Sequence, residues 1–200
     1  MSHGGTAAYT GRSDLPRMVA VAVTAAHACD FELSCRPEHG RLLQVLAGGY
    51  PDGNIGETGT GCGVGLAWLG AGAGPGARLT SVERDAGRAE TARRVFAGDE
   101  RVTIVEGDWT AVLADGPFDL LVLDGAGSGK RGDTPVDVIE ALAIGGTVVI
   151  DDFTPLVVWP PEHLGGPDRA RLHWLEHPAL LAAEIRLAPD LSTIVGRRVR

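Results

Sequence analysis

Residues 54–65 read Asn-Ile-Gly-Glu-Thr-Gly-Thr-Gly-Cys-Gly-Val-Gly, and the architecture of the chain can be inferred outward from them. The first five residues are a short strand candidate that runs directly into a loop with a glycine at every second position. The apolar run from Leu66 to Leu69 then begins a helix. A strand, a glycine-rich turn and a helix in this order are typical of an open α/β sheet, in which ligands bind at the carboxyl ends of the strands.

The same alternation of strand and helix continues along the chain. Further strands are expected at 78–82, 102–105, 118–123 and 146–150, and helices at 86–96, 109–113 and 135–143. Short strands joined by helical crossovers predict a parallel sheet that is covered on both faces. The last two strand candidates, 182–187 and 192–199, are joined by a short turn and predict an antiparallel hairpin. We therefore expect an α/β fold with a doubly wound, mostly parallel seven-stranded sheet that ends in a C-terminal antiparallel hairpin.

The beginning of the chain has a different character. Residues 1–13 are polar and glycine-rich, so we expect them to form a disordered leader. Two helices are expected next, at 15–29 and from Arg36 to about Ala47. No later linker is long enough to divide two domains, so residues 14–200 are predicted to form a single domain.

Composition excludes several classes of protein. The net charge of -8 argues against a nucleic-acid surface, because such a surface needs clustered Lys and Arg. No apolar window is long enough to span a bilayer. The spacing of the three cysteines fits neither a zinc site nor a disulfide framework. We expect a cytoplasmic protein with no nucleic-acid or membrane partner.

The glycine loop does not fit the common nucleotide motifs. In the dinucleotide pattern G-x-G-x-x-G, the third glycine would fall on Val64 or on Leu66, depending on the register. The pattern that is present has Glu57 at the strand end, followed by alternate glycines, with Glu83 at the end of the next strand. Glu57 would repel a pyrophosphate and suit a ligand that carries an ammonium group, and Glu83 could accept hydrogen bonds from ribose hydroxyls. Alternatively, Glu57 caps the following helix and Glu83 is a surface residue.

Six blocks of sequence, in order and spacing, carry a resemblance to the class I S-adenosylmethionine (SAM)-dependent methyltransferases. Within that class, the chain resembles the small O-methyltransferase family that includes catechol O-methyltransferase. The resemblance begins at about Arg36. The blocks are Pro37–Leu43, Gly56–Gly63, Ser81–Glu83, Val105–Trp109, Phe118–Asp124 and Gly145–Asp152.

The resemblance implies a SAM site at the carboxyl ends of the first three strands. The loop that contains Glu57, Gly59, Gly61 and Gly63 would hold the methionine part of SAM. Glu83 would hold the ribose. Asp108 and Trp109 would line the adenine pocket, although Trp109 could equally be a core residue.

The resemblance also implies candidate metal ligands. In the metal-dependent members, one Asp after the fourth strand and an acidic pair after the fifth hold a divalent cation, and Asp124, Asp151 and Asp152 occupy these positions. Such oxygen ligands suit Mg²⁺, which would orient the acceptor hydroxyl and lower its pKa. Alternatively, these carboxylates cap helices or line a polar cleft without a metal, and the sequence leaves both possibilities open.

The catalytic base is the point at which this sequence departs from the family. Relatives carry a Lys three residues after the first metal Asp, and here that position is Gly127. Asp124 and the nearby Lys130 are therefore the catalytic candidates, and His39 and His163 are among the histidines that could act as a general base.

We expect a SAM-dependent methyltransferase that acts on a hydroxyl group of a small molecule, and relatives of this kind are often homodimers. Three alternatives remain. The first is a nicotinamide-dependent oxidoreductase, and the second is a non-catalytic SAM-binding module. The third is a methyltransferase that acts on nitrogen, on protein or on RNA, and the acidic charge argues against RNA.

Overall fold

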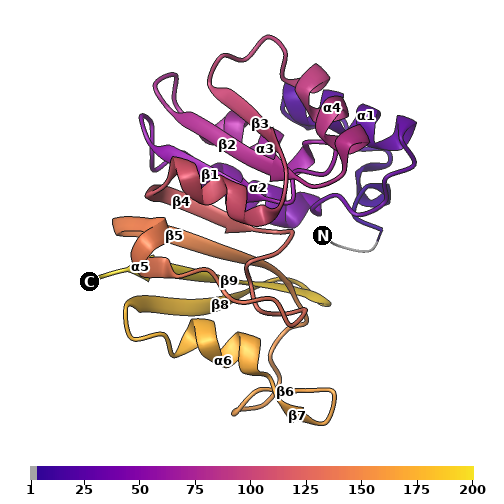
Figure 1. Cartoon of the computed structure of the whole chain (residues 1–200). Coiled ribbons are helices and arrows are strands. Elements are labelled where there is room, and N and C mark those ends of the chain that lie inside the picture. The colour runs from indigo at the N-terminus through magenta and orange to yellow at the C-terminus, as the bar shows by residue number, and fades with distance from the viewer. Residues whose placement is uncertain (1–3) are drawn as a thin grey trace.

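The computed structural model describes residues 4–200, and one seven-stranded sheet organises them (Figure 1). The strand order is β3-β2-β1-β4-β5-β9-β8, and β9 alone runs antiparallel to the other strands of this sheet. The predicted doubly wound sheet with a C-terminal hairpin is confirmed. The strands are β1 (Asn54–Thr58), β2 (Arg78–Glu83), β3 (Val102–Glu106), β4 (Phe118–Leu123), β5 (Leu142–Phe153), β8 (Leu180–Ala188) and β9 (Leu191–Arg198).

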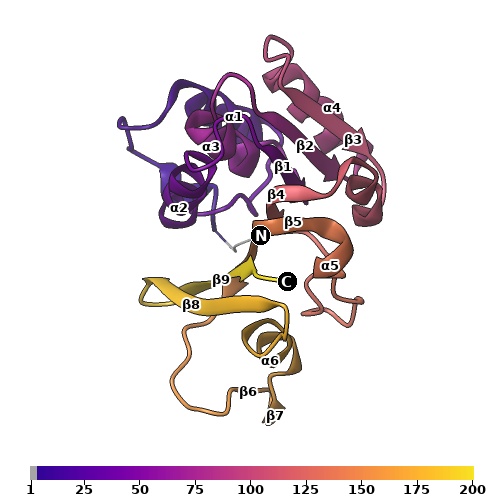
Figure 2. The ribbon, with the colours of Figure 1, turned by 90° about the vertical axis from the view of Figure 1, so that its left-hand side faces the viewer.

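Helices cover both faces of the sheet (Figure 2). One face carries α1 (Arg17–Ala28), α2 (Pro37–Ala47), α3 (Val64–Gly72) and α4 (Ala86–Val95). The other face carries the 3₁₀ helix η2 (Trp109–Asp115), α5 (Val138–Ala141) and α6 (Arg169–Leu175). The strand order changes direction between β1 and β4, which is where ligands bind in open α/β sheets.

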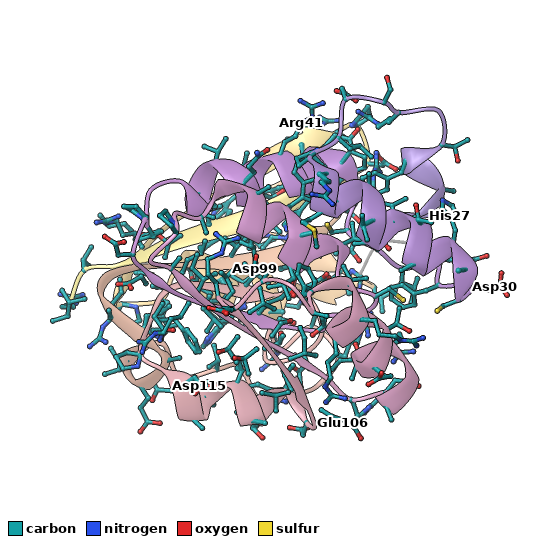
Figure 3. The ribbon with its side chains drawn as sticks, turned by 90° about the horizontal axis from the view of Figure 1, so that it is seen from above. His27, Asp30, Arg41, Asp99, Glu106 and Asp115 are labelled. Atoms are coloured by element: carbon teal, nitrogen blue, oxygen red, sulfur yellow. The ribbon has the colours of Figure 1, made fainter. Side chains whose placement is uncertain are left out.

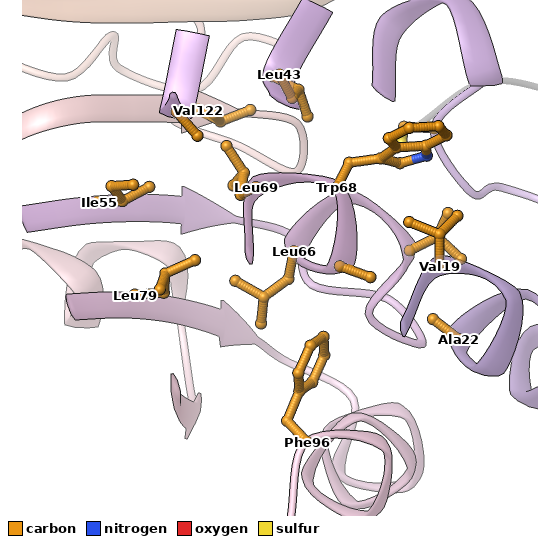
Figure 4. Close-up of a cluster of buried hydrophobic side chains, with 14 of the residues drawn as sticks. Val19, Ala22, Leu43, Ile55, Leu66, Trp68, Leu69, Leu79, Phe96 and Val122 are labelled. Atoms are coloured by element: carbon orange, nitrogen blue, oxygen red, sulfur yellow. The ribbon is translucent and has the colours of Figure 1, made fainter. Parts of the chain in front are cut away.

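Two hydrophobic cores hold these layers together, one on each face of the sheet. Successive residues of β4 alternate between them: Leu120 and Val122 pack with the α1–α3 side, whereas Leu121 and Leu123 pack with the opposite side. In the first core, Trp68 and Leu66 of α3 lie between the sheet and α1 (Figure 4). Because both faces of β4 are buried, its sequence is a continuous apolar run rather than an alternating one.

The predicted leader is ordered where the structure describes it. Residues 4–13 include the 3₁₀ turn η1 (Ala7–Tyr9) and pack onto the first core. The buried Tyr9 hydroxyl donates to Cys35 O at 2.9 Å and accepts a hydrogen bond from Trp68 Nε1 at 2.9 Å. The prediction of disorder, and with it the boundary at residue 14, is therefore wrong for residues 4–13, while residues 1–3 lie outside the described part of the chain.

Two local predictions also need correction. The helix expected at 135–143 is only the single turn α5, because Asp137 caps it at Ile139 N and β5 begins directly afterwards at Leu142. The loop after β5 contains a small hairpin of β6 (Glu162–His163) and β7 (Gly166–Pro167), which the sequence did not indicate. No helix among residues 4–200 is long and apolar enough to cross a bilayer.

Candidate active site

The glycine loop between β1 and α3 adopts the conformations that its sequence predicts. Gly59, Gly61 and Gly63 have φ of +84°, +55° and +94°, a region that L side chains rarely occupy. A Cβ on Gly59 would lie 2.6 Å from the backbone of Gly125, so the loop after β4 approaches closely here. Gly63 is the N-cap of α3 and provides no side-chain cap, so the first N–H groups of the helix remain available at the loop.

Glu83 ends β2 as a buried carboxylate that is 3% exposed. Its Oε2 accepts from Gly61 N at 2.9 Å, and its Oε1 accepts from Asp85 N at 2.9 Å and from Arg88 Nη2 at 2.8 Å. These contacts tie the end of β2 to the glycine loop and to the first turn of α4. Oε2 keeps the capacity to accept a further hydrogen bond. The alternative that Glu83 is a surface residue is wrong.

Glu57 lies behind the glycine loop, where it is 1% exposed. Its Oε2 accepts from Ser81 Oγ at 2.6 Å, and its Oε1 lies so close to Gly65 that a Cβ there would approach it to 2.4 Å. Burial raises the pKa of the Glu57 carboxyl well above its usual range, although the bond from Ser81 opposes this shift. Glu57 thus braces the loop from inside and does not line the cavity described next.

A cavity of about 370 Å³ opens at the carboxyl ends of β1, β2 and β3. Glu83, Asp108, Trp109 and Gly59 line it, and they are four of the residues predicted to hold a cofactor. Asp108 is exposed and caps η2 at Thr110 N, while Trp109 is half-buried and packs against both the cavity and the second core. Trp109 is therefore both a wall residue of the cavity and a core residue, while its contact with adenine stays a prediction.

Four charged residues in the wall of this cavity were missed by the sequence analysis: Arg84, Arg88, Arg131 and Asp133. Asp133 accepts from the N–H groups of Gly127, Gly129 and Arg131, and so it organises the loop after β4. These bonds lower the pKa of Asp133 in spite of its partial burial. The Gly132-Asp133 pair, a few residues after a Gly-x-Gly-x-Gly run, is a turn signal that could have indicated this role.

The space beside Gly61 and Gly65 is nearly closed. A cavity of about 10 Å³ remains between the glycine loop and the segment 31–35, with Asp124 in its wall. Thr6 Oγ1 donates to Phe31 O at 2.5 Å and lies 2.8 Å from Ser34 Oγ, so the N-terminal segment holds residues 31–35 in place. A ligand that extends from the large cavity toward α3 would have to displace part of this segment.

Asp151 is fully buried and faces a histidine. His39, on α2 and 1% exposed, places Nδ1 2.9 Å from Asp151 Oδ1. Although burial opposes it, the His39 imidazole holds the pKa of Asp151 below its usual range. Burial and the neighbouring Asp151 raise the pKa of Asp124. The sequence analysis named His39 only as one possible base and did not foresee this pair.

Lys130 reaches the end of β5, as its position in the loop after β4 allows. Its Nζ donates to the backbone carbonyl oxygens of Asp151 and Asp152, the latter at 3.2 Å, and lies 4.8 Å from the centre of the Phe153 ring. Burial lowers the pKa of this ammonium group. Asp152 itself has φ of +67°, an uncommon conformation outside glycine.

The predicted metal ligands do not fit a divalent-cation site in this arrangement. Among residues 4–200, no three His, Cys, Asp or Glu side chains come together in a way that could hold a metal ion. The Asp151 carboxylate faces His39, and the Lys130 ammonium lies at the backbone of Asp151 and Asp152. A divalent cation placed here would meet a positive charge.

A second cavity, of about 350 Å³, lies beside Lys130 and Asp152. The loop after β5 forms much of its wall, with apolar side chains such as Leu156 and Val158, and the exposed His163 lies at its edge. Arg171 of α6 forms the buried floor and is held by Asp168 Oδ2 at 3.0 Å and by Glu184 Oε2 at 2.5 Å. An apolar wall with a few fixed polar groups is typical of a small-molecule pocket.

Comparison with known proteins relates this chain to methyltransferases. Residues 57–153 match the family model of a methyltransferase domain. The chain is 35% identical over 114 residues to the catechol O-methyltransferase of Mycobacterium tuberculosis, across 53% of this chain and 51% of that protein. It is 33% identical over 113 residues to a protein-L-isoaspartate O-methyltransferase of Chromobacterium violaceum, across 55% of this chain and 48% of that protein. The chain thus spans about half the length of these curated relatives.

The fold extends the similarity over the whole chain. The O-methyltransferase TomG from Streptomyces achromogenes, solved in complex with SAM, superposes with a TM-score of 0.74 at 20% identity, and the match covers 98% of this chain and 96% of TomG. The matched domain, the curated relatives and the strand order agree with the resemblance in the sequence blocks. Residues 57–153 thus carry a methyltransferase domain, and the chain is similar in sequence to O-methyltransferases and in fold to a SAM-bound one.

Proposed function

We propose that this chain binds SAM in the 370 Å³ cavity and transfers its methyl group to a hydroxyl group of a small molecule. The observation that carries the proposal is the position of Glu83, a buried carboxylate in the wall of a cavity at the carboxyl ends of β1, β2 and β3. One oxygen of Glu83 is anchored by Arg88 and Asp85, and the other faces the glycine loop. A carboxylate fixed in this way can accept hydrogen bonds from ribose hydroxyls without reorganising.

The other parts of the cofactor have matching positions. The half-buried ring of Trp109 can stack on adenine, and the exposed Asp108 can accept a hydrogen bond from the adenine amino group. The open N-terminus of α3 suits the carboxylate of the methionine part. Glu57 faces Ser81 and Gly65, so we assign it to bracing the loop rather than to direct contact with the ammonium group.

Methyl transfer is an in-line displacement, in which positioning contributes most of the rate enhancement. The proposed acceptor site is the cavity beside Lys130 and Asp152, because the loop and strand that form it end at the same edge of the sheet as the glycine loop. Asp124 lines the small cavity at the glycine loop and is the preferred acceptor of the hydroxyl proton. Lys130 Nζ already donates to two carbonyl oxygens, which favours a role as a hydrogen-bond donor over that of a base.

The size of the second cavity supports a small acceptor over a macromolecule. Its volume of about 350 Å³ lies in the range of pockets for drug-sized ligands.

A homodimer and a cytoplasmic location remain predictions.

Calorimetric titration with S-adenosylhomocysteine (SAH), the demethylated product of SAM, tests the proposal. Wild type should bind one equivalent, and Glu83→Gln should bind roughly 10- to 100-fold more weakly, because hydrogen bonds to a charged group are lost. The matched control is Glu106→Gln at the end of β3, an exposed residue that pairs with Arg93 and lies outside the cavity wall. Absence of SAH binding, or binding of NADH in its place, would refute the proposal.

A further inference from the structure

The cluster of acidic residues after β4 and β5 contains its own positively charged partner. The resemblance to metal-dependent O-methyltransferases implied a metal site at Asp124, Asp151 and Asp152. In this chain, the only lysine of the whole sequence lies at that cluster. Its position there is defined by contacts with the last three residues of β5, Asp151, Asp152 and Phe153.

Lys130 is held on three sides. Its Nζ donates to the backbone oxygens of Asp151 and Asp152, and the Phe153 ring lies 4.8 Å from Nζ, where its face attracts a cation. The loop that carries Lys130 is itself fixed, because Asp133 accepts from three of its N–H groups and Trp174 Nε1 donates to Ser128 O at 2.9 Å. The Lys130 ammonium group therefore has a fixed position in the site, because both the group itself and its loop are held by hydrogen bonds.

His39 is the second side chain that faces these acidic residues. It approaches Asp151 from α2, with both side chains almost inaccessible to solvent. Gly40, the next residue, has no room for a side chain, since a Cβ there would lie 2.2 Å from the Trp68 ring. The start of α2 is therefore closely packed against α3, and His39 cannot move away from Asp151 without disturbing that contact.

We propose that Lys130 takes the place of a divalent cation in this site and that His39, as a positioning residue, holds Asp151 away from metal coordination, so that the enzyme works without a metal ion. The proposal rests on the proposed methyltransferase function, but its first two measurements do not need turnover. Lys130 would supply the local positive charge next to the acceptor cavity, and His39 would supply the partner for the buried Asp151 carboxylate.

The first measurement uses wild type and Mn²⁺ alone, followed by paramagnetic resonance of the free ion, with Mg²⁺ and Mn²⁺ also tested for a shift in melting temperature. We expect no stoichiometric Mn²⁺ binding and no shift. SAH is titrated in the same samples with and without the metal, and its affinity should be unchanged. Stoichiometric Mn²⁺ binding that is lost in Asp151→Asn would overturn the proposal.

The second measurement removes the internal partners. In Lys130→Met and in the double variant Lys130→Met/His39→Gln, the acidic residues lose one or both of these neighbours and should gain Mn²⁺ binding, which raises the melting temperature by about 3–5 °C at ten times the dissociation constant. His27→Gln, the same exchange on an exposed residue of α1, should behave as wild type (Figure 3). Variants that fold but gain no metal binding would contradict the assignment of Lys130 and His39, and if they do not fold, the wild-type titration still decides.

The combined results for metal binding, SAH binding and methyl transfer distinguish a failure of the metal-free proposal from a failure of the proposed function. If wild type binds SAH but also needs Mn²⁺ or Mg²⁺ for methyl transfer, with loss in EDTA and recovery on adding the metal, this inference fails and the proposed function stands. If wild type binds no SAH under any of these conditions, the proposed function itself fails. EDTA-resistant methyl transfer together with the absence of Mn²⁺ binding would support both.

Discussion

Arg88 and Glu83 form a salt bridge at the mouth of the candidate cofactor cavity. Arg88 Nη2 lies 2.8 Å and Nε 3.2 Å from Glu83 Oε1, and the guanidinium carbon lies 5.5 Å from the centre of the Phe31 ring. One arginine therefore connects the end of β2, the first turns of α4 and the segment that closes the glycine loop. The carboxylate is almost fully buried, whereas about a third of the Arg88 side chain is exposed.

This pair should be energetically coupled. Arg88→Met removes the guanidinium but keeps most of the stem, and it should lower the free energy of unfolding by about 1–2 kcal/mol, a value reduced by the exposure of Arg88. In Glu83→Gln the salt bridge is already lost, so adding Arg88→Met should cost less. Urea denaturation of wild type, both single variants and the double variant measures the coupling, and simple additivity to within about 0.3 kcal/mol would show that the pair contributes nothing.

Gly61 should not tolerate a side chain. In Gly61→Ala the backbone must keep φ of +55°, and the new Cβ would lie 2.7 Å from the Phe31 ring. We expect a loss of about 1–3 kcal/mol in the free energy of unfolding, together with weaker SAH binding. Gly98→Ala is the matched control, because a Cβ at Gly98 meets no atom within 4 Å. Equal stability of the two variants would contradict the loop geometry.

Tyr9→Phe tests the order of the N-terminal segment. The Tyr9 hydroxyl joins Trp68 Nε1 to Cys35 O in the first core, and its removal leaves the buried indole N–H without a partner. We expect the free energy of unfolding to fall by about 1–3 kcal/mol. Thermal or urea denaturation gives the value. An unchanged stability is the result expected of a disordered leader, and it would restore the interpretation that the sequence first suggested.

Trp109→Ala should weaken the binding of SAH because the adenine loses its stacking partner. Stacking of a base on an aromatic side chain is worth about 1–3 kcal/mol, which corresponds to a loss of affinity of roughly 5- to 150-fold. Trp159→Ala is the control, since Trp159 is 56% exposed on the loop after β5 and lies outside the cavity wall. Calorimetry on both folded variants measures the difference, and equal affinities would place the adenine elsewhere.

Much of the fold could be predicted because its signals are local. The strand at 54–58 and the strand at 118–123 were predicted to the residue, since turn residues bound each of them on both sides. The alternate glycines Gly59, Gly61 and Gly63 predicted a loop whose backbone has positive φ angles. The leader was missed because its order depends on contacts of Thr6 and Tyr9 with partners 25 to 59 residues away.

The candidate site was predictable only in part, because some of its contacts join residues that are far apart in the sequence. Glu83 and Trp109 follow strands in the parallel sheet, and parallel strands bring their carboxyl ends together, so their juxtaposition follows from the order of the elements. The contact between His39 and Asp151 joins a helix and a strand 112 positions apart, and no spacing in the sequence encodes it. Asp133 and Arg88 act through bonds to backbone groups and to another side chain, which composition and periodicity do not show.

A crystal structure of the chain with SAH is the most direct test. We predict an adenosyl group in the 370 Å³ cavity, with both ribose hydroxyls within hydrogen-bond distance of the Glu83 carboxylate, the adenine against Trp109, and residues 31–35 displaced from the glycine loop. Density for SAH at another place, or an empty cavity in crystals grown with saturating SAH, would contradict it.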